Sequence, residues 1–212
     1  LDPIFITQLK NIKYRGSVSR VHFELNELPE IKGVSNEEMN TFFTVSPSIE
    51  YLERASDACK YGEISKNPFI EFSFPTINNP EFSSERNHIL SATIQYTPYK
   101  LRRNEWSSSL KETLKENIIS ILSAYIPGIN SLIKSTHIFT PVDFEQQFGI
   151  KEGSFNHGEM TLDQFFFMRP TISTSQYKSP ISNLFICGSS THPGGGIHGA
   201  NGYNAAKEIL KA

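Results

Sequence analysis

Glycine is concentrated in one stretch near the carboxy end of this 212-residue chain, where six of its 13 glycines fall between positions 188 and 202. A short apolar run without alternation, residues 184–187, precedes the stretch, and residues 200–210 after it have helical composition. A tightly packed turn would explain two or three glycines. Six of them in a strand–loop–helix unit predict a backbone that closely approaches a ligand, because glycine has no Cβ to hold it away. The free N–H groups and the positive dipole end of the helix would suit a phosphate or an electron-rich ring oxygen.

The bulk composition excludes several classes of protein. The hydrophobic fraction is 38%, and Lys+Arg 20 against Asp+Glu 22 gives a net charge of -2. This is typical of a soluble globular chain and excludes disorder and a broad nucleic-acid footprint. No apolar run is long enough to span a bilayer, and no Cys/His spacing predicts a metal site. The lack of a disulfide framework and of glycosylation acceptors favours the cytoplasm.

Strand and helix patterns alternate irregularly along residues 1–175. Alternation or short apolar runs predict strands over 16–25, 69–74, 88–97 and around 135–139. Ser46 and Pro47 predict the start of a helix that ends near residue 62, and a capping box from Ser109 to Glu112 predicts a second helix over 110–125. A short helix is expected over 142–148. Since no regular βαβ order is visible, the chain is predicted to be α+β, with a mixed sheet and helices.

Two blocks of sequence make a family resemblance specific. Residues 183–210, containing Thr-His-Pro-Gly-Gly-Gly-Ile-His-Gly, resemble the carboxy-terminal signature of phytoene-dehydrogenase-like FAD oxidoreductases. Residues 155–170, ending in Phe-Phe-Phe-Met-Arg-Pro, resemble the segment that precedes it in that family. Residues 88–98 and 140–145 also fit in the right order, so the resemblance covers roughly residues 60–212.

The resemblance implies a domain division and a cofactor. Residues 1–175 would be a substrate-binding domain, and residues 176–212 the carboxy-terminal strand, loop and helix of a Rossmann-like FAD domain. The reaction implied is hydride transfer between an apolar substrate and flavin N5. The residues implied to contact FAD are Gly188 and Ser189 beside the ribityl-pyrophosphate, and Gly195, Gly196, Ile197 and His198 beside the ring.

The chain departs from the family pattern because no strand followed by G-x-G-x-x-G and a helix occurs in these 212 residues. The chain also starts at Leu1 without an initiator Met. We therefore expect it to be the carboxy-terminal part of a longer flavoprotein, whose amino-terminal FAD-binding half is its missing partner. Alone, it is expected to hold little or no FAD and to be inactive. Residues 184–187 would then lack parallel neighbours.

Five residues are candidates for contact with an apolar small-molecule substrate, and each has a structural alternative. His157 would be a polar group near the cofactor or a loop histidine, and Phe166 and Met168 would line a tunnel or fill the core. Arg169 would meet an acidic group or form a salt bridge at a domain hinge. Tyr96 would contact the substrate or have only a structural role, and the structural role is the more common one for such a tyrosine. No catalytic residue is assigned, because no Ser/His/Asp order or carboxylate pair is visible.

A second function class stays open at this point. The chain would then be a truncated domain that acts as a binding or interaction module without redox chemistry. A dinucleotide fingerprint upstream of Leu1, or a yellow protein that bleaches with dithionite, would favour the oxidoreductase. Within the enzymes, an amine-oxidase-like protein is a lesser alternative. An apolar substrate also leaves peripheral contact with a membrane open, and the oligomeric state is not predicted.

Overall fold

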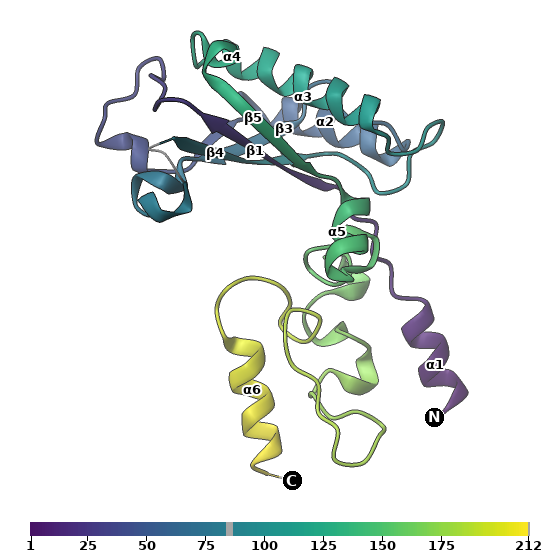
Figure 1. Cartoon of the computed structure of the whole chain (residues 1–212). Helices are drawn as coiled ribbons and strands as arrows, with labels where there is room; N and C mark the ends of the chain where they lie inside the picture. Colours follow the sequence, from purple (N-terminus) through teal and green to yellow (C-terminus); the bar gives the residue numbers. More distant parts are fainter. Residues whose placement is uncertain (84–86, 212) are drawn as a thin grey trace. The chain divides into compact units, whose positions relative to one another are not determined.

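A computed structural model describes residues 1–83 and 87–211 of the chain (Figure 1). The chain divides into two compact units. The first, called here the sheet unit, is Ser17–Phe144. The second, called the loop unit, combines Leu1–Gly16 with Glu145–Ala212. The predicted boundary between residues 175 and 176 concerns the domains of a whole flavoprotein and stays a prediction.

The sheet unit is built on one five-stranded sheet with the strand order β2-β3-β4-β1-β5. Every pairing in it is antiparallel, so the predicted mixed sheet is wrong. The reason lies in the alternation of β1 and β4, which bury every second residue, as in an antiparallel sheet with one covered face. The strands are β1 (Val18–Leu25), β2 (Phe43–Val45), β3 (Phe69–Ser73), β4 (His88–Gln95) and β5 (Ile133–Phe139).

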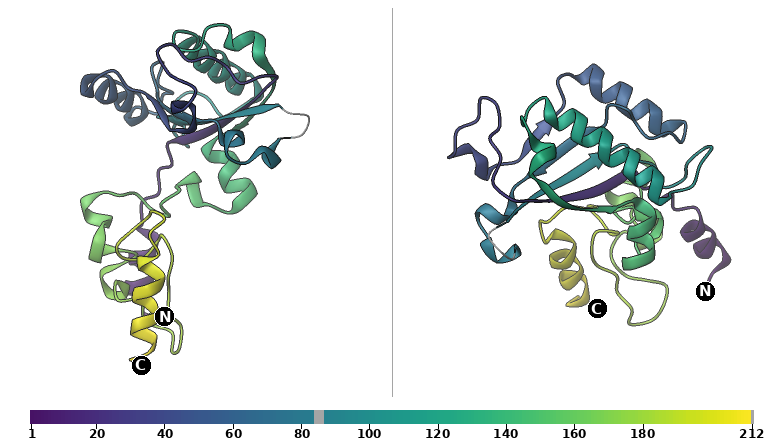
Figure 2. Two further views of the ribbon diagram at one scale, coloured as in Figure 1. Left: turned by 90° about the vertical axis from the view of Figure 1, so that its left-hand side faces the viewer. Right: turned by 45° about the horizontal axis from the view of Figure 1, so that its top comes forward.

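Helices α2 (Ile49–Lys60) and α3 (Ser108–Ser123) cover one face of this sheet (Figures 1 and 2). The core forms where Leu114, Ile118 and Leu122 of α3 meet the inward residues of the strands, such as Phe23 and Leu90, all of which are at most 2% exposed. Burial of these apolar side chains supplies the main favourable term for the fold of the unit. The predicted strand and helix types are therefore confirmed here.

Both predicted helix caps are wrong by two residues. The Oγ of Ser48 accepts from the Tyr51 amide at 3.1 Å and caps α2, so Pro47 lies before the helix. The Oγ of Ser107 accepts from the Leu110 amide at 3.3 Å and caps α3. In both cases the capping residue is a serine with extended backbone, and its Oγ accepts the backbone N–H of the residue three positions later.

The opposite face of the sheet, called here the open face, carries the other half of the alternation. On β1 it presents Arg20, His22 and Glu24, which are only half-buried. On β5, an edge strand of the sheet, it presents His137 and Phe139. These side chains are mostly polar, in contrast to the apolar face beneath α3.

The loop unit contains little regular structure apart from α1 (Pro3–Lys10) and α6 (Ala200–Ile209). Residues 184–187, predicted as a buried strand, form only one antiparallel bridge, between Lys178 and Phe185. Leu184 is 46% exposed and Cys187 is exposed, because no neighbouring strand covers them among the described residues. A Rossmann-like assignment is not confirmed for this segment. Among the apolar residues of α6 only Ala205 is buried, and Ile209 is 49% exposed.

The remaining helical elements are short. They are α4 (Ile129–Leu132), α5 (Pro141–Phe148), η1 (Glu38–Asn40), η2 (Pro75–Ile77), η3 (Pro80–Phe82), η4 (Lys151–Gly153), η5 (Leu162–Gln164), η6 (Phe166–Met168) and η7 (Ile172–Thr174). Helix α5 begins with a capping box. Thr140 donates its amide N–H (2.7 Å) and hydroxyl (2.6 Å) to Asp143 Oδ2, and the Asp143 amide donates back to Thr140 Oγ1 at 3.3 Å.

Asp143 also joins α5 to α3, since its Oδ1 lies 2.7 Å from the Lys111 Nζ. Burial opposes ionisation of this carboxyl, but the hydrogen bonds from Lys111 and Thr140 outweigh burial and lower its pKa below the ordinary value. A carboxylate with a depressed pKa stabilises the fold at neutral pH, and the stabilisation is lost as pH falls through the folded-state pKa.

We predict that Asp143→Asn lowers the free energy of unfolding at neutral pH by about 1 kcal/mol, since the carboxylate that pairs with Lys111 and accepts from Thr140 loses its charge. The difference from the wild type should be complete above about pH 5 and should shrink below about pH 4, where the unfolded carboxyl becomes protonated. Urea unfolding across this range measures it. As a control, Asp57→Asn removes an exposed ion pair with Lys60 and should change little. An equal, pH-independent loss in both variants would contradict the prediction.

Candidate functional site

The glycine-rich loop, residues 188–199, has one packed half and one open half, both within the loop unit. In the packed half, a Cβ on Gly195 would lie 2.2 Å from Asn156 Oδ1, and a Cβ on Gly194 would lie 2.9 Å from Met160 Cε. The loop thus lies directly against residues 156–160. A Cβ at Gly195 would force the Asn156 side chain to move, and at Gly194 the positive φ of 126° disfavours any side chain.

Asn201 fixes the packed half from the first turn of α6. Its amide Nδ2 lies within hydrogen-bonding distance of four acceptors in the loop: the carbonyl oxygens of Thr191 (2.9 Å), His192 (3.2 Å) and Gly194 (3.2 Å), and Thr191 Oγ1 (3.3 Å). Asn201 is only 6% exposed. Since a buried amide without partners is costly, these contacts hold the loop to the start of the helix.

A second contact supports the same loop from the other side. The hydroxyl of buried Tyr177 donates to the His192 carbonyl at 2.7 Å. Asn204, one turn along α6 from Asn201, donates its amide to the same hydroxyl at 3.0 Å. The loop from Thr191 to Gly194 is therefore attached to α6 at two points.

The open half of the loop presents backbone and one apolar side chain to solvent. Gly188, Gly196 and Gly199 adopt positive φ, and no atom lies within 4 Å of a Cβ built at Gly188 or Gly199. Ile197 is fully exposed, and the exposed His198 accepts the Ala200 N–H at its own Nδ1 (3.1 Å). The backbone here is accessible beside the amino end of α6, where N–H groups and the helix dipole favour electron-rich groups. This arrangement fits a cofactor that contacts glycine backbone.

Arg169 is the most highly connected side chain beneath the loop. Its guanidinium is 2% exposed and donates to backbone carbonyl oxygens on two separate segments. The acceptors are Asn156, His157 (3.3 Å), Gly158 (3.5 Å), Glu159 (3.1 Å), Gln164 (3.1 Å) and Ser189 (3.4 Å), with the Met160 sulfur at 3.2 Å. Burial lowers the pKa of the guanidinium from its ordinary value. The carbonyl dipoles stabilise a charge for which no carboxylate partner is present among the described residues.

A hollow of about 390 Å³ lies beside this guanidinium in the loop unit. Predicted site residues His157 and Arg169 both line it, together with Ser190. Leu9, Ile12 and Ile186 supply apolar walls. The Arg169 Nε is buried and has no hydrogen-bond partner in the described part of the chain. The structure therefore brings these two predicted residues together in one hollow with mixed walls.

The other predicted substrate residues lie apart from this hollow. Phe166 is 50% exposed, and its ring contacts Phe165, with centroids 4.0 Å apart. Met168 is half-buried in η6 and lines a separate small hollow with Pro170. Tyr96 is half-buried and belongs to the sheet unit, which is described by itself. The substrate roles of all five residues stay predictions.

Sequence reasoning missed the two residues that attach the loop to the rest of the unit. Asn201 and Tyr177 were not among the candidates, although both are buried. The available signal was an asparagine directly after the loop, at the helix start, where a short amide can turn back to loop carbonyls. Tyr177 gave no local signal, because its partner His192 lies 15 positions away.

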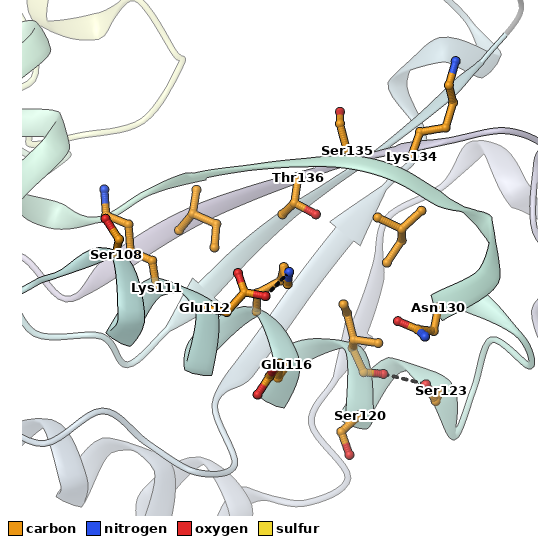
Figure 3. A pocket seen from close by; sticks show the side chains of 14 residues that line it. Ser108, Lys111, Glu112, Glu116, Ser120, Ser123, Asn130, Lys134, Ser135 and Thr136 are labelled. Atoms are coloured by element: carbon orange, nitrogen blue, oxygen red, sulfur yellow. Dashed lines mark hydrogen bonds and ion pairs between the residues drawn. The ribbon is translucent and has the colours of Figure 1, made fainter.

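Other hollows and clusters offer less defined chemistry. A hollow of about 950 Å³ lies between α3 and β5 and contains none of the predicted residues (Figure 3). Its Lys111 and Lys115 are paired with Asp143 and Glu112. Across residues 1–83 and 87–211, no group of three or more His, Cys, Asp or Glu could hold a metal. No helix in the same ranges has the length and apolarity to cross a membrane.

Comparison with known proteins gives a consistent set of relatives, although no family model matches the chain. The chain is 31% identical to the rat pyridine nucleotide-disulfide oxidoreductase domain-containing protein 2 over 220 residues, which cover 100% of the chain and 38% of the relative. It is 34% identical to a limonene dehydrogenase subunit of Castellaniella defragrans over 116 residues, 54% of the chain and 21% of the relative. It is 25% identical to a lycopene-forming phytoene desaturase of a Paracoccus species over 185 residues, 86% of the chain and 34% of the relative.

The matches cover between 54% and 100% of the chain but only a minor part of each relative. The printed names of these relatives are those of an oxidoreductase domain-containing protein, a dehydrogenase subunit and a phytoene desaturase. The phytoene desaturase agrees with the phytoene-dehydrogenase-like family inferred from the two sequence blocks. The resemblance predicted from residues 155–170 and 183–210 is confirmed. The chain is therefore similar to a carboxy-terminal portion of FAD oxidoreductases of the phytoene-dehydrogenase-like kind, and it spans well under half the length of the relatives it matches.

Proposed function

We propose that this chain is part of an FAD-dependent oxidoreductase that transfers a hydride between an apolar substrate and flavin N5. The open half of the glycine-rich loop is the observation that carries the proposal. It combines accessible glycine backbone, the amino end of α6 and the exposed Ile197. Bound flavin would supply the hydride chemistry, and this chain would supply placement and the exclusion of water.

In this proposal Gly188, Ser189, Gly195, Gly196, Ile197 and His198 hold the cofactor. Gly188 and Gly196 offer backbone without a Cβ. The amino end of α6 would favour negative charge at the nearby edge of the ring. Residues 1–175 would be the substrate-binding domain, and 176–212 the closing segment of the FAD domain. The full protein would supply the ADP-binding half upstream of Leu1.

Arg169 acts in the proposal as a positioning residue. Its guanidinium joins the carbonyls of residues 156–159 to the Ser189 carbonyl, and so holds the first residues of the loop at a fixed place. His157, which shares the hollow with Arg169, would face the substrate side. Phe166 and Met168 would add apolar contact, and for Tyr96 contact with the substrate stays a proposal from the sequence alone.

The first test is spectroscopic. We expect the protein purified from its complete reading frame to be yellow, with a flavin spectrum that bleaches on addition of dithionite and returns in air. The isolated 212-residue chain should take up little FAD. A full-length protein that stays colourless after incubation with FAD would overturn the proposal, and the alternative of a binding or interaction module would replace it.

The packed glycines give a second prediction. Gly195→Ala should displace the loop, because its Cβ would clash with Asn156 Oδ1. We expect the full-length variant to retain FAD about tenfold less tightly, a loss of about 1.4 kcal/mol. The matched control is Gly202→Ala in α6, where no heavy atom lies within 4 Å and alanine favours the helix. Fluorescence of released flavin measures both. Equal FAD affinities in the two variants would contradict the role of the loop.

Removing the guanidinium gives a third prediction. Arg169→Gln leaves several buried carbonyl oxygens without donors, which should cost about 2–4 kcal/mol of unfolding free energy. Arg169→Lys keeps the charge but loses the planar fork, so an intermediate loss is expected. A positioning role also predicts a shift of the flavin absorption maximum in Arg169→Lys. Arg54→Gln, at an exposed helical ion pair, is the control and should change neither property. Wild-type stability and spectrum in Arg169→Gln would contradict the prediction.

A further inference from the structure

The open face of the sheet gathers three basic side chains on neighbouring strands. Arg20 and His22 lie on β1, two residues apart and therefore on the same face. The β1–β5 register places His137 directly opposite His22, and Phe139 directly opposite Arg20. Side chains opposite each other on antiparallel strands lie close enough to bind one group together.

The hydrogen-bonding capacity of these three side chains is largely unused. Arg20 donates Nη1 to Thr93 Oγ1 at 2.7 Å and forms no ion pair among the described residues. Neither the His22 nor the His137 imidazole has a hydrogen bond within residues 1–83 and 87–211. Their rings instead contact Phe139, with centroids 6.3 Å away for His22 and 4.4 Å for His137. Donors are therefore available around an aromatic ring.

The acidic groups of the same face are not hydrogen-bonded to this cluster in the described part of the chain. Glu24 accepts hydrogen bonds from Asn87 Nδ2 (2.6 Å) and Ser135 Oγ (2.8 Å), so its carboxylate has other partners. Glu71 lies on β3, opposite Thr93 of β4. Strand β4 therefore separates Glu71 from β1. The guanidinium of Arg20 therefore has no carboxylate paired with it among the described residues.

The surroundings favour an anion over a metal ion at the two imidazoles. Burial, and after it the positive charges of Arg20 and His137, lower the pKa of His22 below its ordinary value. The same repulsion from Arg20 would act on a metal cation. An anion would instead be attracted, and would accept hydrogen bonds from the guanidinium and from an imidazole N–H.

We propose that Arg20, His22 and His137 form a binding site for an anionic oxygen group, a carboxylate or a phosphate, of a small molecule. The guanidinium gives charge and a forked donor, and each imidazole gives one further donor. Phe139 packs against the apolar part of the ligand next to the anionic group. The site belongs to the sheet unit and does not depend on the proposed redox function, since it needs neither flavin nor turnover.

The test is an NMR titration of the histidine ring nitrogens in the full chain. The probes are inorganic phosphate, acetate and octanoate, with sodium chloride at matched ionic strength as the control for screening. We expect saturable shifts of the His22 and His137 rings. His88 lies in the same unit near Thr76 and should not shift, so it is an internal reference. Stronger binding of octanoate than of acetate identifies an amphiphile as the ligand class, and stronger binding of phosphate identifies a phosphate.

Variants make the test specific for the cluster. Arg20→Gln should weaken probe binding about tenfold or more, since it removes the charge-assisted donors. Lys66→Gln removes an exposed positive charge elsewhere in the same unit and should bind as the wild type does. His137 is exposed on the edge strand, so His137→Gln gives a second variant if Arg20→Gln fails to fold. Shifts no larger than those with sodium chloride, or equal binding by all variants, would overturn the proposal.

Discussion

The buried guanidinium of Arg169 determines how the loop unit is arranged. It is a charge without a carboxylate partner in the described chain, so backbone carbonyls must converge on it to offset the cost of burial. Convergence of residues 156–159 brings Asn156 and Met160 against the glycine-rich loop. The close approach then excludes a Cβ at Gly194 and Gly195. Through these contacts the charge of Arg169 determines which residues pack against the first half of the loop, while the other half stays accessible.

The sequence predicted well what depends on local periodicity. Alternation identified β1 and β4, because burial of one face of a sheet requires just this spacing, and the run of residues 110–125 identified α3. The glycine-rich loop was recognised as a place where backbone approaches something closely. Its packed half approaches residues 156–160 of the same chain, and contact of its open half with a cofactor stays a prediction.

Features that depend on distant contacts could not be predicted in the same way. Residues 184–187 have the composition of a buried strand, but a strand forms only when neighbours supply hydrogen bonds, and here one bridge is all that forms in the described chain. Asn201 and Tyr177 look polar or ambiguous in sequence and are buried because their partners converge in three dimensions. The mixed sheet failed as a prediction because it gave too little weight to the alternation of β1 and β4, which favours an antiparallel sheet with one covered face but does not say which strands pair.

The open face of the sheet bears on the substrate as well as on the proposed anion site. A hydrocarbon such as a polyene would gain from an aliphatic wall, since its binding depends on the apolar area removed from water. This face instead combines the basic groups Arg20, His22 and His137 with the aromatic ring of Phe139. Covering it with hydrocarbon alone would leave those donors without partners, at a cost of about 1–3 kcal/mol for each buried group. If a substrate lies on this face, it must therefore carry an anionic group at one end of its apolar body.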